Sequence, residues 1–206
     1  MSEAHIRIVK SMLEFCFLAV LAVMPAMLVN IDLGDDGVWN GEFTLTELAQ
    51  ELLLACSALL FWILSVKRPE LRGFTLLVAG FFTCALIREL DGFLDHIQHG
   101  FWLYPALLVA LGSIGWVLTF CRKDVIKPMA AFIDTKPYFL IILGLITLLF
   151  FSRTIGSGKL LWDGVLGNMY SSYFKNALQE GIELYGYSLI AYGAVLYSNM
   201  QLRRSR

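Results

Sequence analysis

The chain has 206 residues, of which 58% are hydrophobic and 16% are charged, and its formal net charge is -1. A soluble domain of this length carries about a quarter charged residues, so the composition excludes an ordinary soluble domain and predicts a polytopic membrane protein. The basic residues form short loop clusters and no nucleotide-binding glycine motif occurs, so nucleic-acid binding has no support.

Six apolar segments predict transmembrane helices, because about 20 helical residues span a hydrocarbon core of about 30 Å. The first follows Arg7 and Lys10, contains Pro25 and lacks a convincing cleavage site, so we expect an uncleaved span with a kink. The predicted fold is a single all-α six-helix transmembrane domain over residues 1–206. Its spans are 12–31, 45–66, 73–91, 101–121, 137–152 and 176–200, with an outer interfacial loop at 153–175.

An acidic connection follows the first span and leads into the second. Its acids are Asp32, Asp35, Asp36 and Glu42. Thr44 or Thr46 is placed to cap the next helix, with Glu47 in the first turn, where a carboxylate favours the positive end of the helix dipole. The four cysteines lie in or beside apolar runs without a CxxC pair, so neither a disulfide framework nor a cysteine metal site is indicated.

The distribution of basic residues predicts the orientation of the bundle. Six spans place both termini on one side, and twelve of the sixteen Lys and Arg residues fall on that side. Basic residues concentrate in cytoplasmic loops, so we expect an inner (plasma) membrane protein with both termini cytoplasmic. The twelve are Arg7, Lys10, Lys67, Arg68, Arg72, Arg122, Lys123, Lys127, Lys136, Arg203, Arg204 and Arg206.

Three predicted helices carry polar groups at matching depth near the outer side. Helical spacing places Glu47 with Glu51 on the second helix, and Glu180 with Glu183 and Tyr187 on the sixth, beside Gln179. The third helix carries two stripes. These are Arg88, Asp91, Asp95 and His99, and Glu89 with His96.

An energetic argument predicts that these three faces converge. A carboxylate facing lipid below the interface costs roughly 2–3 kcal/mol, so each should face protein or water. Arg88 is the deep cation on this side and is expected to pair with Glu51, Glu183 or Glu89, because a partner offsets much of the cost of burial. The remaining acids must then be protonated, hydrated or bound to a cation.

Three functions remain open at this point, and the sequence does not decide whether the protein is an enzyme. The leading one is a cation- or proton-binding transporter, or a subunit of a membrane complex, with Glu51, Glu183 and Asp95 as carriers and His96 or His99 as a titrating group. The second is a metal-dependent hydrolase acting on a lipid, with a divalent metal ion as cofactor. The third is a structural or assembly protein whose charges form internal ion pairs.

The hydrolase hypothesis lacks a motif. HExxH, Gly-x-Ser-x-Gly and paired Glu-x-x-His are all missing from the sequence. The expected partners are the lipid bilayer and either a second copy of the chain or another membrane subunit.

Overall fold

The computed structural model describes residues 2–34, 44–162 and 172–203. Nearly all of these residues are helical and none of them lies in a strand. The long helices are α1 (Glu3–Leu33), α2 (Leu45–Lys67), α3 (Arg72–Glu89), α5 (Leu103–Phe120), α7 (Lys136–Ile146) and α10 (Ser172–Arg203). The short elements are η1 (Pro69–Leu71), α4 (Asp91–Leu94), η2 (Arg122–Asp124), α6 (Ile126–Ile133), η3 (Thr147–Phe151), α8 (Ser152–Gly156) and η4 (Gly158–Trp162).

Five helical segments in the described part of the chain are long and apolar enough to cross a membrane. They are Glu3–Leu33, Leu45–Lys67, Pro69–Glu89, Leu103–Phe120 and Lys136–Gly156. These lengths meet the requirement for crossing the hydrocarbon core of a bilayer. The prediction of an all-helical protein with membrane-length helices is therefore confirmed.

The fifth segment is longer than the predicted span 137–152. Helix α7 continues through the single π turn η3 into α8, so that helical structure extends to Gly156. The predicted loop 153–175 is consequently helical in α8 and η4, and α10 begins at Ser172. Its remaining residues, 163–171, lie outside the described part of the chain, as do Asp35, Asp36 and Glu42.

Helix α10 has 32 residues but is not among the five segments, because polar side chains lower its hydropathy. They include Gln179, Glu183, Ser188 and Gln201, all buried or half-buried. A helix whose polar residues are covered by protein does not need the uniformly apolar surface of a lipid-facing span. The low hydropathy of α10 is therefore explained by the burial of its polar residues within the protein.

The helices form two compact units. The first unit comprises Met1–Leu48 and Ile146–Ser188, and the second comprises Ala49–Leu145 and Leu189–Arg206. Helix α10 contributes its first part to the first unit and its second part to the second unit.

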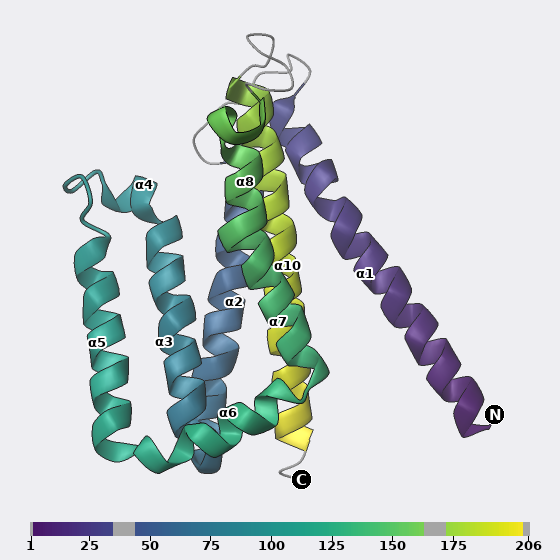
Figure 1. Cartoon of the computed structure of the whole chain (residues 1–206), viewed down its shortest axis with the longest axis vertical. Coiled ribbons are helices and arrows are strands. Elements are labelled where there is room, and N and C mark those ends of the chain that lie inside the picture. Colours follow the sequence, from purple (N-terminus) through teal and green to yellow (C-terminus); the bar gives the residue numbers. More distant parts are fainter. Residues whose placement is uncertain (1, 35–43, 163–171, 204–206) are drawn as a thin grey trace. The chain divides into compact units, whose positions relative to one another are not determined.

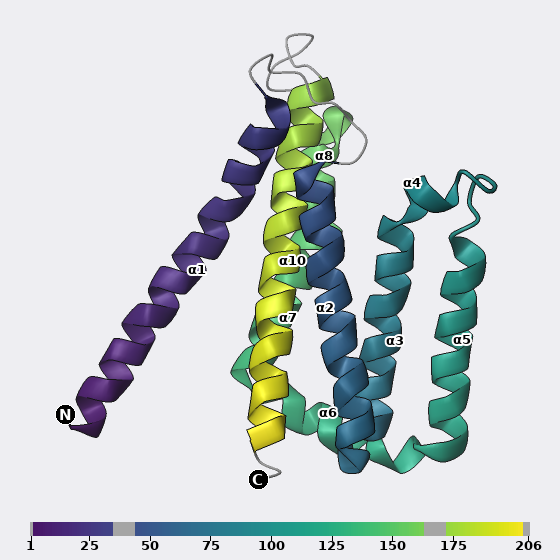
Figure 2. The same cartoon turned by 180° about the vertical axis from the view of Figure 1, so that it is seen from behind.

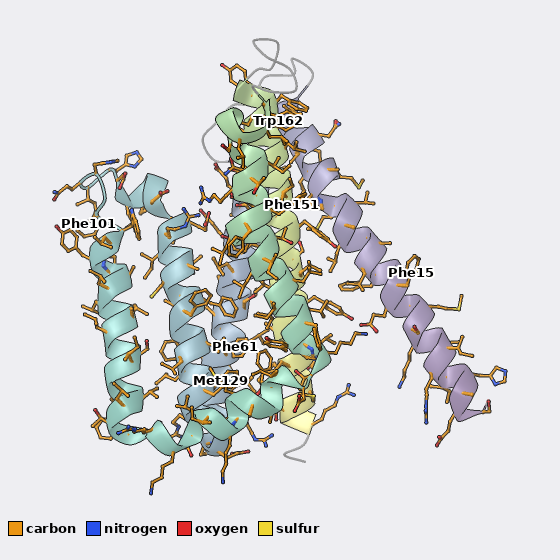
Figure 3. All side chains as sticks on the ribbon, in the orientation of Figure 1. Phe15, Phe61, Phe101, Met129, Phe151 and Trp162 are labelled. Carbon is orange, nitrogen blue, oxygen red and sulfur yellow. The ribbon has the colours of Figure 1, made fainter. Side chains whose placement is uncertain are left out.

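An aromatic cluster forms the core of the second unit. Tyr197 of α10 is 1% exposed, and its ring centroid lies 5.8 Å from Phe61 of α2 and 4.8 Å from Phe132 of α6. Phe74 of α3 lies 5.2 Å from Phe132 and Phe82 lies 5.7 Å from Phe61. Figure 3 shows Phe61 among the side chains of this core. Offset and edge-to-face rings at these distances add to the stabilisation from burial.

Helices α3 and α5 lie side by side in the second unit and are joined through α4 (Figures 1 and 2). Gly80 of α3 faces Ser113 of α5 so closely that a Cβ atom at Gly80 would lie 2.6 Å from the Ser113 Oγ. Gly73 similarly faces the backbone oxygen atoms of Cys121 and Asp124. Small residues near the start and in the middle of α3 therefore allow the two helices to approach closely.

One end of the second unit gathers basic residues. There Arg68 donates a hydrogen bond to the backbone oxygen of Gln201, and Arg72 Nε donates to the Ser65 oxygen at 3.0 Å. Helix α6 runs along this end, where α2 finishes and α3 begins (Figure 2). Lys67, Arg122 and Lys123 also belong to segments that meet at this end of the second unit. The opposite end of α3 carries Arg88 and leads through α4 to Asp95, His96 and His99.

Candidate functional site

The predicted site residues are divided between the two units. Glu47, Gln179, Glu180, Glu183 and Tyr187 belong to the first unit. Glu51, Arg88, Glu89, Asp91, Asp95, His96 and His99 belong to the second. The convergence of the three acidic faces stays a prediction, and each group is described within its own unit.

Glu183 is the most enclosed acid among the described residues of the first unit. Its side chain projects from α10, and the residue is 6% exposed. Its Oε1 atom accepts a hydrogen bond from Ser152 Oγ at 2.5 Å and another from Gln179 Nε2 at 3.0 Å. Among the residues that the structure describes, no Lys, Arg or His forms an ion pair with Glu183. A buried carboxyl group is thus held by neutral donors.

The local helix geometry places Ser152 against Glu183. Ser152 is fully buried and follows directly on the π turn η3. A π turn changes the helical phase of the residues that follow it, and such turns are frequent at functional sites. Gln179 lies one helical turn before Glu183, and its side-chain amide fills the space beside Gly156 that a Cβ atom would need. Ser152 and Gly156 therefore complete the surroundings of the Glu183 carboxyl group.

Sequence reasoning did not find Ser152. The available signal was a single hydroxyl side chain at the end of the apolar run Leu148–Phe151, within a predicted span. A hydroxyl in such a run usually bonds to the carbonyl four residues earlier on its own helix, so its donation to another helix could not be inferred.

Glu47 has a structural role at the start of α2. Thr44 and Glu47 form a capping box: the Glu47 amide donates to Thr44 Oγ1 at 3.1 Å, and the Thr44 amide donates to Glu47 Oε2 at 3.3 Å. The prediction that Thr44 or Thr46 caps this helix is confirmed for Thr44. Glu47, proposed as an ion or proton ligand, is engaged in that cap.

Asp32 supplies a second cap to the same helix. Its Oδ1 accepts from the Leu45 amide at 2.8 Å, and its Oδ2 accepts from the Thr46 amide at 2.8 Å and from Thr46 Oγ1 at 2.5 Å. A carboxylate at a helix N-terminus satisfies backbone donors that have no partner within the helix and interacts favourably with the dipole. This acid, expected only as part of a loop, therefore ties the end of α1 to the start of α2.

Arg88 and Glu89 form an ion pair in the second unit, which is one of the pairings predicted for Arg88. The Arg88 side chain is 42% exposed and that of Glu89 is 13% exposed. The pair closes the last turn of α3, where a cation also complements the negative end of the helix dipole. The Arg88 side chain is therefore more exposed than we expected from its predicted depth in the third span.

Asp95 and His99 shape the turn between α4 and α5. Asp95 Oδ2 lies 2.9 Å from His99 Nδ1, while Asp95 Oδ1 accepts from the Gly100 amide at 2.8 Å. Gly100 has φ of 78°, a left-handed conformation that glycine adopts without strain. His96 Nδ1 lies 2.9 Å from the Gly92 oxygen, and Asp91 is exposed. These polar groups act on the local turn.

The same turn carries exposed apolar side chains. Phe93 and Ile97 are 67% and 66% exposed, and Tyr104 is 63% exposed with its ring 6.0 Å from Phe101. Figure 3 shows Phe101 at this end of α5. Aromatic and apolar residues beside charged ones are typical of a segment at a membrane–water interface.

The remaining candidates are Glu51, Glu180 and Tyr187. Glu51 and Glu180 are half-buried, and Tyr187 is 6% exposed. In the parts of the chain that the structure describes, no group of three His, Cys, Asp or Glu side chains is arranged to hold a metal ion. The donors expected for a divalent cation are thus not gathered into a shell there.

The chain was compared with protein-family models, with curated proteins and with solved structures, and no match was found in any of the three comparisons.

Proposed function

We propose that this chain is a six-span inner-membrane protein with cytoplasmic termini, in which the Glu183 carboxyl group binds and releases a proton during transport. The observation that carries the proposal is the enclosure of Glu183, whose Oε1 accepts hydrogen bonds from Ser152 and Gln179. A carboxyl group inside a membrane helix carries a free-energy cost, so its presence usually marks a functional site. Proton relays are one common function of such groups.

The side chains that contact Glu183 are better suited to a site that binds a proton than to a site that binds a metal ion. Calcium takes about six to eight oxygen ligands and magnesium about six, whereas the described contacts of Glu183 involve one hydroxyl and one amide. The Ser152 hydroxyl can donate to the ionised carboxylate or accept from the protonated one, because a hydroxyl is both donor and acceptor. The two protonation states can therefore share one geometry.

The predicted orientation would give this site access to the outer side. It rests on twelve of the sixteen basic residues, and the basic end of the second unit agrees with it. A sixth span requires α10 to cross the membrane. Its length of 32 residues is sufficient, since about 20 residues span the hydrocarbon core.

A carbodiimide reagent tests the proposal, because it modifies protonated carboxyl groups in apolar surroundings. We expect Glu183 of the reconstituted protein to be labelled. Glu183→Gln should lose both the label and any proton flux into vesicles driven by a membrane potential. The matched control is Glu180→Gln, which changes the neighbouring half-buried acid and should retain both. A Glu183 that is never labelled, with equal flux in both variants, would refute the proposal.

A second function, as a subunit of a membrane complex, is favoured by α1. In this helix, which the structure describes throughout, Pro25 alone is buried, and large apolar residues are exposed around it. Phe15, labelled in Figure 3, is 73% exposed. This candidate predicts that substitutions on α1 abolish assembly with a partner, while Glu183→Gln leaves that assembly intact.

A further inference from the structure

A cavity of about 540 Å³ lies inside the first unit, between α1, the π turn and the first part of α10. Its size falls within the range of about 300–1,000 Å³ that is usual for small-molecule sites. Side chains from three elements line it, including Ala22, Ala26, Val29, Phe151, Ala177 and Gly181.

The cavity extends along the first part of α10. On α10 its lining runs from Phe174 to Tyr185, which corresponds to about 16 Å at a rise of 1.5 Å per residue. On α1 its lining runs from Ala22 to Leu33, in the C-terminal part of that helix, which lies beside the first part of α10 (Figures 1 and 2). We call this cavity between the two helices the wedge.

Small residues line this space without closing it. In membrane helices, small side chains usually allow the backbones to come into contact. Here the approach is close at Gly181, where a Cβ atom would lie 3.3 Å from Val29 Cγ2, yet Ala22, Ala26 and Ala177 still border the cavity. Larger residues at these positions would fill it, so the sequence leaves the space open.

The lining is almost entirely hydrocarbon. Asn30, Thr147 and Tyr185 are its polar residues, and the others are alanine, valine, leucine, isoleucine, phenylalanine, proline and glycine. A cavity with such a lining does not hold ordered water, because a water molecule needs two to four polar partners. The occupant should therefore be apolar and elongated.

We propose that the wedge binds one acyl chain of a membrane phospholipid. Both walls include membrane-length segments, Glu3–Leu33 and Lys136–Gly156, so lipid is the solvent that meets the opening. An acyl chain gains dispersion contacts with walls that would otherwise face a void. Glu183 is about 200° round α10 from Gly181 at 100° per residue, so this site is separate from the proposed proton site.

Photocrosslinking of the full chain tests this site. The protein is reconstituted in phosphatidylglycerol vesicles that contain a trace of the same lipid with a diazirine on one acyl chain, and adducts are mapped by mass spectrometry. We expect adducts to concentrate on Ala26, Phe151 and Leu178 relative to Leu108, which is 74% exposed on α5.

Ala26→Phe should lower the adduct yield at Phe151 and Leu178 by about tenfold, the change expected if the ring excludes about two methylene groups from the wedge. Val20→Phe is the matched control, since Val20 is 64% exposed on α1 and does not line the cavity. Ala22→Leu serves as a milder second variant, should Ala26→Phe fail to fold, and should lower the yield in the same direction.

Two results would overturn the proposal. The first is a yield at Phe151 and Leu178 that equals the yield at Leu108 and is unchanged in Ala26→Phe and Ala22→Leu. The second is efficient crosslinking between copies of the chain when the diazirine is instead placed on residue 26, which would assign the wedge to a second copy. Neither result depends on Glu183, so the two proposals stand or fall separately.

Discussion

At the scale of single residues, several of the described acids stabilise local structure. Glu47 and Asp32 cap α2, Asp95 bonds to the backbone of Gly100, and Glu89 pairs with Arg88. Glu183 differs, because its Oε1 joins side chains from α8 and from α10 itself. These acids therefore combine roles in local structure with one enclosed carboxyl group.

Loss of the Asp32 cap should destabilise the protein. Asp32→Ala removes the acceptor for the Leu45 and Thr46 amides and for the Thr46 hydroxyl, and Thr46 is fully buried. We expect a loss of about 1–2 kcal/mol, as for other N-cap substitutions, measured as a lower unfolding midpoint in detergent. Asp134→Ala, at an exposed acid beside α6, is the control and should shift the midpoint little. Equal midpoints for the two variants would contradict a capping role.

The sequence predicted a threonine cap for α2 but not the Asp32 cap. Thr44 and Glu47 are three residues apart, which is the spacing of the capping box that the structure shows. Asp32 lies 13 residues before Leu45, and no spacing rule relates an acid at the end of one helix to the amides of the next. The role of Ser152 could not be predicted for the same reason, since its bond to Glu183 depends on which helices become neighbours.

At the scale of helices, some glycines lie at close helix–helix contacts and others lie on open surface. A Cβ atom at Gly193 of α10 would lie 2.7 Å from Ile141 Cγ1 and 3.0 Å from the Pro137 oxygen of α7, both in the second unit. Gly112 and Gly115 of α5 have no such neighbours within 4 Å among the described residues. The position of a glycine in the sequence does not identify the helix on the other side of such a contact.

Gly193→Ala should therefore destabilise the second unit. The Pro137 oxygen is a backbone atom and cannot move aside as a side chain does, so we expect a loss of about 1–3 kcal/mol from overpacking. Gly115→Ala is the matched control, since alanine is favoured over glycine by up to about 1 kcal/mol inside a helix. Thermal unfolding of both variants decides the point, and a Gly193→Ala protein as stable as Gly115→Ala would show that α7 is not packed there.

At the scale of the whole molecule, the sequence predicted six spans, and the described part of the chain has membrane-length apolar segments at five of them, with bounds that differ mainly at their ends. The α7–α8 helix was predicted too short, because Arg153 and Gly156 interrupt the apolar run while the backbone continues through a π turn. Helix α10 is not among these five segments because its polar side chains lower its hydropathy. Those side chains are covered by protein. The division into two units has no sequence signal, since it depends on long-range packing.

Cysteine labelling tests the orientation and the sixth span together. In a chain whose four cysteines are replaced by alanine, we expect Gln98→Cys to react with an impermeant maleimide in intact cells. Lys123→Cys and Arg203→Cys should react only after permeabilisation, because both belong to the predicted cytoplasmic side. All three positions are exposed in the structure. Labelling of Arg203→Cys in intact cells, with Lys123→Cys protected, would show that α10 does not cross.

Because of the π turn at Thr147–Phe151, the number of residues in this segment affects how its side chains are oriented. Thr147 lines the cavity of the first unit and Ser152 reaches Glu183, so the turn sets the angle between two different surfaces of one helix. A π turn accommodates one more residue than an α turn, because its hydrogen bonds run from residue i to residue i+5. Deleting a single codon between Thr147 and Ser152 would therefore restore an α-helical path and leave Ser152 facing nearly the same way, whereas inserting one codon would rotate Ser152 by about 100° relative to Thr147. After the insertion both residues would remain in the sequence, but the hydroxyl group would no longer face its carboxyl partner. In this segment, a one-residue deletion should be tolerated better than a one-residue insertion.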